Sequence, residues 1–192
     1  MSRERDSQPL AALTSWQATS LVILRTLIGW HFLYEGYYKW SLPAWTAEGK
    51  PLGPFSAAGY IKGGDGPLAG LAQSALDAGL LPWINGLVIF GLVAVGISLM
   101  LGLLTQLGCL GGLALLSMFY LTAIPTTGLP QTGAEGTYLF INKTLIEGVA
   151  VLALFTFDTG RIAGLDRLWK ERRRLATSAA LDRSPFAQGS ES

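Results

Sequence analysis

No charged residue occurs between Asp77 and Glu135 in this chain of 192 residues. Within that interval, two mainly apolar runs, at about 83–103 and 105–124, are separated only by a tight turn near 104–106. About 20 apolar residues in a helix are enough to cross the roughly 30 Å hydrocarbon core of a bilayer. The interval therefore predicts an antiparallel pair of membrane-spanning helices. Small residues at helical spacing along both runs predict that the two backbones approach closely.

Composition supports a membrane protein, because half of the chain is hydrophobic and only 14% is charged. Two further runs, at about 18–40 and 137–157, bring the expected number of spans to four. The predicted fold is therefore an all-α four-helix transmembrane bundle. A long outer loop at 41–82 is expected to contain two short helices, near 55–61 and 67–80, the second of which begins with a proline.

Basic residues set the expected orientation, since lysine and arginine favour the cytoplasmic side of a membrane. An arginine-rich segment follows the fourth span, and we expect an amphipathic basic helix at 158–175 lying at the membrane interface. Four spans then place the N-terminal tail, 1–17, in the cytoplasm and the loops at 41–82 and 125–136 outside. Residues 176–192 are expected to be disordered. The charged tail and the long apolar run after it predict no secretory signal peptide, and the expected location is the plasma or inner membrane.

The first expected span contains an unusual number of ionisable side chains: Arg25, His31, Glu35 and Lys39. Each such group near the middle of a bilayer costs about 2.5–3.5 kcal/mol on insertion scales. The last three fall at four-residue steps and so share one face of a helix. A network that only stabilises the bundle is one interpretation. Buried ion pairs gain little over apolar packing, however, so these residues favour a functional site.

The fourth expected span repeats this pattern with an Asn-Lys pair followed by a glutamate. Depth changes by about 1.5 Å per residue along a helix, so residues of the two spans can be matched by depth. Depth pairs Glu35 with Lys143. It also places Glu147 at the level of His31, with Arg25 as the alternative partner. If the two spans are neighbours, they form one inward-facing polar cluster, with Trp30 and Tyr34 alongside: Arg25, His31, Glu35, Asn142, Lys143 and Glu147.

Five short motifs are distributed along the chain: Arg-x-x-x-Gly-x-x-Phe-x-x-x-Gly at 25–36, Phe-Ser-Ala-Ala-Gly-Tyr at 55–60, Gly-Pro-Leu-Ala at 66–69, Asn-Lys-Thr-Leu-Ile-Glu-Gly-Val-Ala at 142–150 and Gly-Arg-x-x-Gly-Leu-Asp at 160–166. Together they resemble the DoxX/DoxD-like membrane proteins, over roughly Leu24 to Leu168. The resemblance implies a four-helix membrane protein. The best-described members resemble the large subunit of thiosulfate:quinone oxidoreductase, which oxidises thiosulfate to tetrathionate, reduces quinone and has a separate small subunit.

The expected function is that of a membrane subunit of a quinone-linked oxidoreductase acting on a small sulfur anion. Quinone is then a membrane substrate that needs an apolar slot and proton donors. The candidate catalytic residues are His31, Glu35 and Glu147, which could supply protons. The candidates for holding the quinone ring or an anion are Arg25, Trp30, Tyr34, Tyr38, Lys39, Asn142 and Lys143. For the aromatic residues taken singly, core packing is the more common role.

Two other functions remain open at this point. One is a non-catalytic anchor or assembly subunit, which would bind a small partner subunit or a soluble redox protein. The other, less favoured, is a small-solute transporter, since four spans offer no inverted repeat unless the chain forms a homo-oligomer. The single Cys109 excludes a Cys-x-x-Cys redox pair, and the single histidine excludes bis-histidine haem ligation within the chain. No haem, flavin or metal is predicted, and the lipid bilayer, not nucleic acid, is the expected partner.

Overall fold

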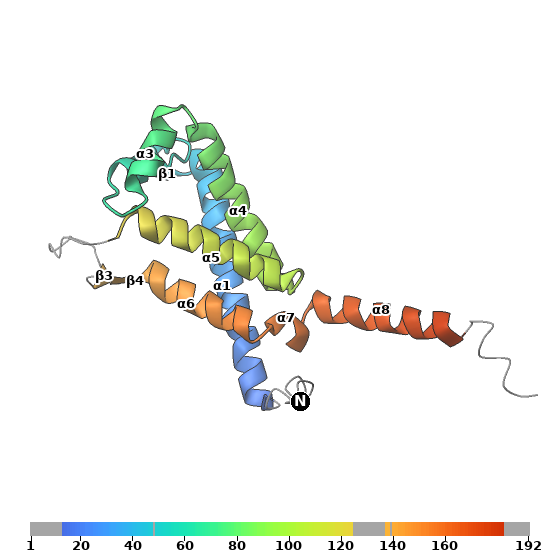
Figure 1. Ribbon diagram of the computed structural model, residues 1–192. Helices are drawn as coiled ribbons and strands as arrows, with labels where there is room; N and C mark the ends of the chain where they lie inside the picture. The colour runs from blue at the N-terminus through green and yellow to red at the C-terminus, as the bar shows by residue number, and fades with distance from the viewer. Residues whose placement is uncertain (1–12, 48, 125–136, 139, 183–192) are drawn as a thin grey trace, which may run out of the picture.

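Most of the described chain is helical in the computed structural model, which covers residues 13–47, 49–124, 137, 138 and 140–182 (Figure 1). The long helices that form the body of the molecule are α1 (Ser15–Ser41), α4 (Leu81–Leu101), α5 (Thr105–Thr122) and α6 (Lys143–Thr156). The all-α class predicted from the sequence is therefore confirmed.

Short elements connect these helices, and two of them are the helices expected in the long loop. The connecting elements are the 3-10 helix η1 (Leu42–Ala44), the strands β1 (Thr46–Ala47) and β2 (Lys50–Pro51), helix α2 (Ala58–Lys62), helix α3 (Ala69–Asp77), and the strands β3 (Thr137–Tyr138) and β4 (Ile141–Asn142). After α6 come helix α7 (Thr159–Ile162) and helix α8 (Leu165–Asp182). Each strand pair is an antiparallel hairpin. The predicted loop at 125–136 lies outside the described residues.

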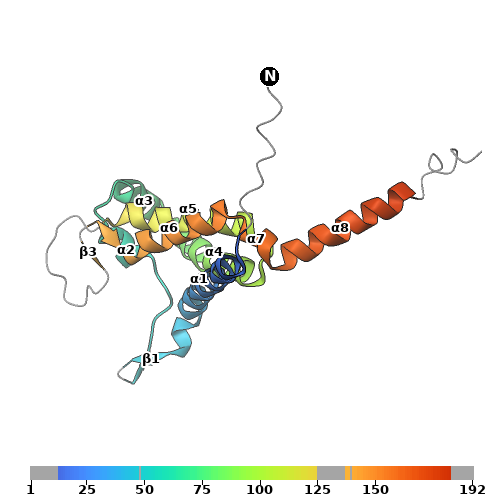
Figure 2. The same ribbon diagram turned by 90° about the horizontal axis from the view of Figure 1, so that it is seen from below.

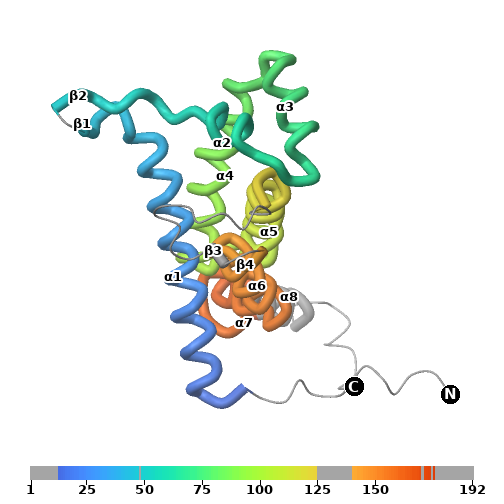
Figure 3. Tube along the Cα trace, turned by 90° about the vertical axis from the view of Figure 1, so that its left-hand side faces the viewer, coloured from blue at the N-terminus to red at the C-terminus, as the bar shows by residue number. Residues whose placement is uncertain are grey.

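The long helices form two pairs, with α1 running along α4 and with α5 beside α6. The α5–α6 pair crosses the α1–α4 pair obliquely (Figures 1 and 3). Glycines bring α1 and α4 into close contact: a Cβ atom at Gly36 would lie 3.0 Å from the backbone nitrogen of Val93, and one at Gly96 would lie 2.5 Å from that of Leu33. Substituting either glycine would therefore force the two backbones apart.

A hydrophobic core fills the space where the two pairs cross. Phe32 of α1 is 2% exposed, and Leu99 of α4 and Leu154 of α6 are fully buried. Cys109 of α5 is also fully buried and packs in this core. All four long helices therefore contribute to one core, which fixes their relative positions.

Two helices of the described chain are long and apolar enough to cross a membrane. Helix α4 has 21 residues with a mean hydropathy of 2.3, and α5 has 18 residues with a mean hydropathy of 1.3. They form a helical hairpin, as predicted. Helix α6 has 14 residues, which span about 21 Å at about 1.5 Å per residue. It is thus shorter than the hydrocarbon core of a typical bilayer.

Several helix ends differ from the predicted boundaries, and three of the differences have a clear physical cause. Helix α6 begins at Lys143 instead of near residue 137, because the β3–β4 hairpin precedes it and the side chain of Asn142 accepts a hydrogen bond from the backbone of Leu145 at 2.9 Å. Helix α4 ends at Leu101, two residues before the predicted end at 103, because Gly102 after it has a φ of +62°. Helix α8 continues to Asp182, past residue 175, through an alanine-rich segment that favours helix.

Candidate functional site

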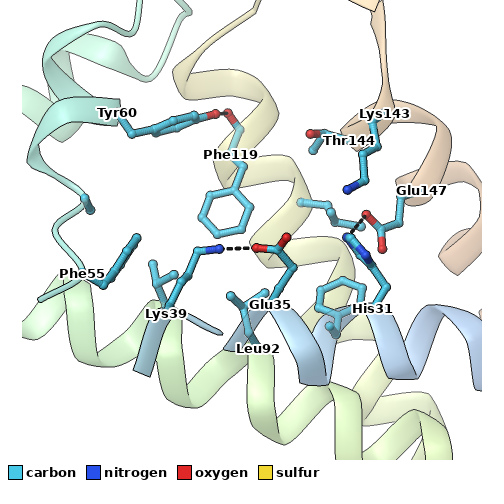
Figure 4. Close-up of a pocket in the computed structure, with 14 residues that line it drawn as sticks. His31, Glu35, Lys39, Phe55, Tyr60, Leu92, Phe119, Lys143, Thr144 and Glu147 are labelled. Carbon is cyan, nitrogen blue, oxygen red and sulfur yellow. Dashed lines mark hydrogen bonds and ion pairs between the residues drawn. The ribbon is translucent and has the colours of Figure 1, made fainter. Parts of the chain in front are cut away.

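A cavity of about 290 Å³ lies where α1, α4, α5 and α6 meet the segment that contains α2. Its wall has an apolar side and a polar side (Figure 4). The polar side is formed by His31, Glu35 and Lys39 of α1 together with Lys143, Thr144 and Glu147 of α6. Five of the ten site residues predicted from the sequence therefore line one cavity, and they come from the two helices that were expected to carry the site.

His31 and Glu147 lie next to each other on the polar side of this cavity (Figure 4). The distance from Nε2 of His31 to Oε2 of Glu147 is 3.6 Å. The side chain of Glu147 is 13% exposed and that of His31 is 35% exposed. A histidine opposite a carboxylate can hold and transfer a proton near neutral pH. This is the pairing that depth along the helices predicted.

Glu35 forms its ion pair with Lys39, one turn further along α1. The expected pair between Glu35 and Lys143 is therefore wrong. The i, i+4 spacing lets Glu35 and Lys39 meet on a single helix, which takes less ordering of side chains than a contact between helices. The ammonium of Lys39 also lies 5.7 Å from the centre of the Phe55 ring, within the range of a cation–π contact.

Lys143 is the first residue of α6, and its side chain points into the cavity (Figure 4). No described carboxylate lies within 4.0 Å of its ammonium group in an ion pair. Two lysines and two glutamates thus face the cavity, with one of the lysines not matched to a carboxylate at contact distance. The positive group nearest to the His31–Glu147 pair in Figure 4 is this lysine.

The apolar side of the cavity was not predicted. It is formed by Phe32, Phe55, Ala57, Tyr60, Val88, Leu92, Leu116 and Phe119. The hydroxyl of Tyr60 donates a hydrogen bond to the backbone carbonyl of Phe119 at 2.6 Å, and burial raises the pKa of that hydroxyl. The Tyr60 and Phe119 rings also meet edge to face, with centres 6.2 Å apart. The motif at 55–60 is the sequence feature that could have indicated this wall, since it places two aromatic residues five positions apart.

The aromatic residues that were predicted to flank a bound ring lie elsewhere. Trp30 and Tyr34 are 55% and 45% exposed and stack on each other outside the cavity, with ring centres 6.2 Å apart. Tyr38 is 37% exposed and contacts the ring of Trp45. Their expected place beside the polar cluster is wrong. A rotation of about 100° per residue along a helix turns Trp30 away from the face that carries His31.

Arg25 also lies outside the cavity, near the junction of α7 and α8. It is 3% exposed, and its guanidinium donates hydrogen bonds to the backbone carbonyls of Thr159 at 2.9 Å and Ala163 at 2.7 Å. Arg25 therefore links α1 to the segment after α6, and its expected membership of the polar cluster is wrong. Asn142, the last predicted member, does not line the cavity either, because its side chain caps α6.

The cavity therefore offers an apolar slot with several aromatic walls, a histidine–carboxylate pair on one side and lysines nearby. This suits a small planar or amphiphilic molecule that carries polar oxygen atoms. Within the part of the chain that the structure describes, no three His, Cys, Asp or Glu side chains are grouped so that they could hold a metal ion. No protein-family model, curated protein or solved structure matches this chain.

Proposed function

We propose that this protein is a DoxX-like membrane subunit of a quinone-linked oxidoreductase and that the cavity binds the quinone ring. In this proposal α1, α4, α5 and α6 together are embedded in the plasma or inner membrane, with both termini on the cytoplasmic side. The observation that carries it is the His31–Glu147 pair, 3.6 Å apart, at the edge of an apolar, aromatic-lined cavity.

The dimensions of the cavity fit the ring of a quinone. Small-molecule sites commonly measure about 300–1,000 Å³, so the cavity volume of about 290 Å³ lies just below the lower limit of that range. It accommodates a head group, and an isoprenoid tail would extend into the surrounding lipid. In this proposal Phe55 and Phe119 would supply aromatic surface for the ring, and the polar side chains of the cavity would face its carbonyl oxygens.

The chemistry of the cavity matches the needs of quinone reduction. Reducing a quinone to a quinol takes two electrons and two protons. Two thiosulfate ions that join through a new sulfur–sulfur bond release the two electrons. His31 and Glu147 would deliver protons to the quinone oxygens and recover them from water, with no net change in either residue. Lys143 and Lys39 would attract the anionic donor toward the cavity.

The test is quinone reduction by the purified protein in proteoliposomes with thiosulfate as the donor, followed by quinone absorbance. We expect Glu147→Gln and His31→Gln each to lower the rate by roughly 100-fold, since general acid–base catalysis commonly contributes that much. Tyr34→Phe is the matched control on the outer face of α1 and should keep the wild-type rate. Wild-type rates in both cavity variants would overturn the proposal, as would the absence of turnover and of quinone-induced thermal stabilisation in the unmodified protein.

A further inference from the structure

Helix α8 projects away from the body of the molecule (Figures 1 and 2), and apolar side chains on one of its faces are exposed. That face contains Leu165, Leu168, Trp169 and Leu175, which are between 41% and 70% exposed. Their spacing of three, four and ten residues from the first places them on one side of a helix. An apolar helix face of this length in water is unfavourable, so a partner is expected to cover it.

The same helix is strongly basic. Residues 161–174 contain six basic and two acidic residues. The guanidinium of Arg173 lies 4.7 Å from the centre of the Trp169 ring, so a positive group and an interfacial aromatic residue share one edge of the apolar face. Arg172 is also exposed, and its position seven residues after Leu165 places it on the same side of the helix. A face that combines leucines and a tryptophan with arginines is complementary to a bilayer surface with anionic headgroups, because the long arginine side chains can reach the phosphates.

The start of α8 is fixed at the end of the apolar α4–α5 hairpin. The carboxylate of Asp166 accepts hydrogen bonds from the backbone N–H groups of Leu104 at 2.7 Å and Thr105 at 2.8 Å. The N–H of Asp166 donates in turn to the carbonyl of Gly102 at 2.9 Å. These bonds hold α8 at the level where the two most apolar helices end, which is the boundary between hydrocarbon and water if those helices cross a membrane.

The apolar face of α8 is also turned toward the side on which α4 lies. Leu165 and Leu168 line a groove together with Met100 and Leu101 from the end of α4, and Arg167 and Glu171 form its polar edge. The apolar surface of α4 therefore continues onto the first turns of α8. A helix that entered the aqueous phase would gain nothing from this arrangement, whereas a helix lying flat on the bilayer would bury both surfaces in one lipid layer.

We infer that α8 lies on the anionic surface of the bilayer that holds α4 and α5, with its leucines and Trp169 in the acyl boundary and its arginines on lipid phosphates. This inference concerns membrane attachment and does not depend on any reaction in the cavity. It gives the C-terminal helix a defined partner, a bilayer that contains anionic lipid.

The experiment measures the depth of spin labels on α8 in the full chain, reconstituted into phosphatidylcholine vesicles with or without phosphatidylglycerol. Labels are placed at Leu168→Cys or Arg167→Cys in a Cys109→Ala background, which removes the natural thiol. With anionic lipid, the label at 168 should collide more with oxygen than with a nickel chelate, and the label at 167 should show the reverse. In phosphatidylcholine alone, the surface-bound population at 168 should fall by roughly tenfold or more.

Matched charge variants separate attraction to lipid from a general effect of charge. Arg172→Gln/Arg173→Gln should reduce the difference between the two vesicle types, whereas Lys50→Gln/Lys62→Gln, which removes two charges before α3, should leave it unchanged. Nickel contact that dominates at both labels in anionic vesicles would overturn the inference, because α8 would then lie in water. Spin–spin broadening without oxygen contact would also overturn it and would identify a second copy as the covering partner. Equal depth in both vesicle types would refute the role of anionic lipid.

Discussion

Two regions along α1 use ionisable residues in opposite ways. Arg25 is buried, donates to two backbone carbonyls and lies among glycines that allow no additional atoms. His31, two turns further on, faces a cavity and has one loosely placed partner at 3.6 Å. The first region holds chain segments together, and the second leaves its polar groups accessible to a ligand. Whether an ionisable residue in an apolar helix is structural or functional must therefore be judged from its contacts as well as from the free-energy cost of burying it.

The region around Arg25, which we call the Arg25 joint, comprises Arg25, Gly102, Gly160, Gly164 and Asp166. A Cβ atom at Gly164 would lie 2.8 Å from the Cα of Gly102, and one at Gly160 would lie 2.6 Å from Oγ1 of Thr105. Asp166 caps the start of α5 from this joint. Three of its members belong to the motif Gly-Arg-x-x-Gly-Leu-Asp, so this motif has a structural explanation in the contact between the α4–α5 turn and the α7–α8 turn.

The largest expected loss of stability follows from replacing Arg25 in the Arg25 joint. Arg25→Met keeps an apolar stem but removes the guanidinium hydrogen bonds to the carbonyls of Thr159 and Ala163, which should lower the free energy of unfolding by about 3 kcal/mol. The matched control is Arg161→Met, whose side chain is 67% exposed and should change it by less than about 0.5 kcal/mol. Unfolding by SDS in mixed micelles measures both. Equal losses in the two variants would show that the joint does not depend on Arg25.

The next effect concerns the glycines of the joint. Gly160→Ala would place a methyl group 2.7 Å from the carboxylate of Asp166 and should lower the free energy of unfolding by about 2 kcal/mol through overpacking. Gly148→Ala is the control, because a Cβ atom there meets nothing within 4 Å. Since it lies inside α6, alanine should raise stability there by about 0.5–1 kcal/mol. The same detergent titration gives both values, and a loss in the control as large as that at Gly160 would contradict the packing explanation.

The sequence predicted the class of fold and the two helices that carry the polar side of the cavity, because apolar runs and charges inside them are visible without a structure. Depth matching found the pair His31–Glu147 because the predicted fourth span, 137–157, placed Glu147 at the depth of His31, although helix α6 begins only at Lys143. The same method misplaced Arg25, since depth along a helix says nothing about direction around it. Six residues correspond to about 600°, so Arg25 and His31 point about 120° apart.

The apolar wall of the cavity could not be predicted in the same way. Leu116 and Phe119 lie in a continuous apolar helix, where no periodic pattern separates cavity-facing positions from lipid-facing ones. Phe55 and Tyr60 reach the cavity only because the loop after α1 folds back over the ends of α4 and α5. Such long-range placement depends on tertiary packing and is not encoded in local propensity.

A smaller change in the free energy of unfolding, of opposite sign, is expected when the polar pair in the cavity is replaced. His31→Leu/Glu147→Leu replaces a polar pair by apolar side chains, and such replacements are often neutral or stabilising, here by about 1 kcal/mol. The double variant should unfold at a higher SDS fraction while losing quinone binding, measured as quinone-induced thermal stabilisation. Trp30→Leu/Tyr34→Leu on the outer face should retain that stabilisation by quinone. If the cavity double variant were as unstable as Arg25→Met, the cavity would be a second structural joint rather than a binding site.

The smallest expected effect distinguishes an accessible ion pair from a structural one. Glu35 is 38% exposed and Lys39 is 21% exposed, so the coupling between them in a double-mutant cycle with Glu35→Gln and Lys39→Met should be at most about 0.5 kcal/mol. Solvent screens such a pair, and added salt should reduce the coupling further. A coupling of several times that size would mean that the pair is held as firmly as Arg25. A small coupling combined with a clear change in anion or quinone affinity would instead show that these residues are retained for a ligand, because their contribution to folding alone would be too small to require two charges beside an apolar core.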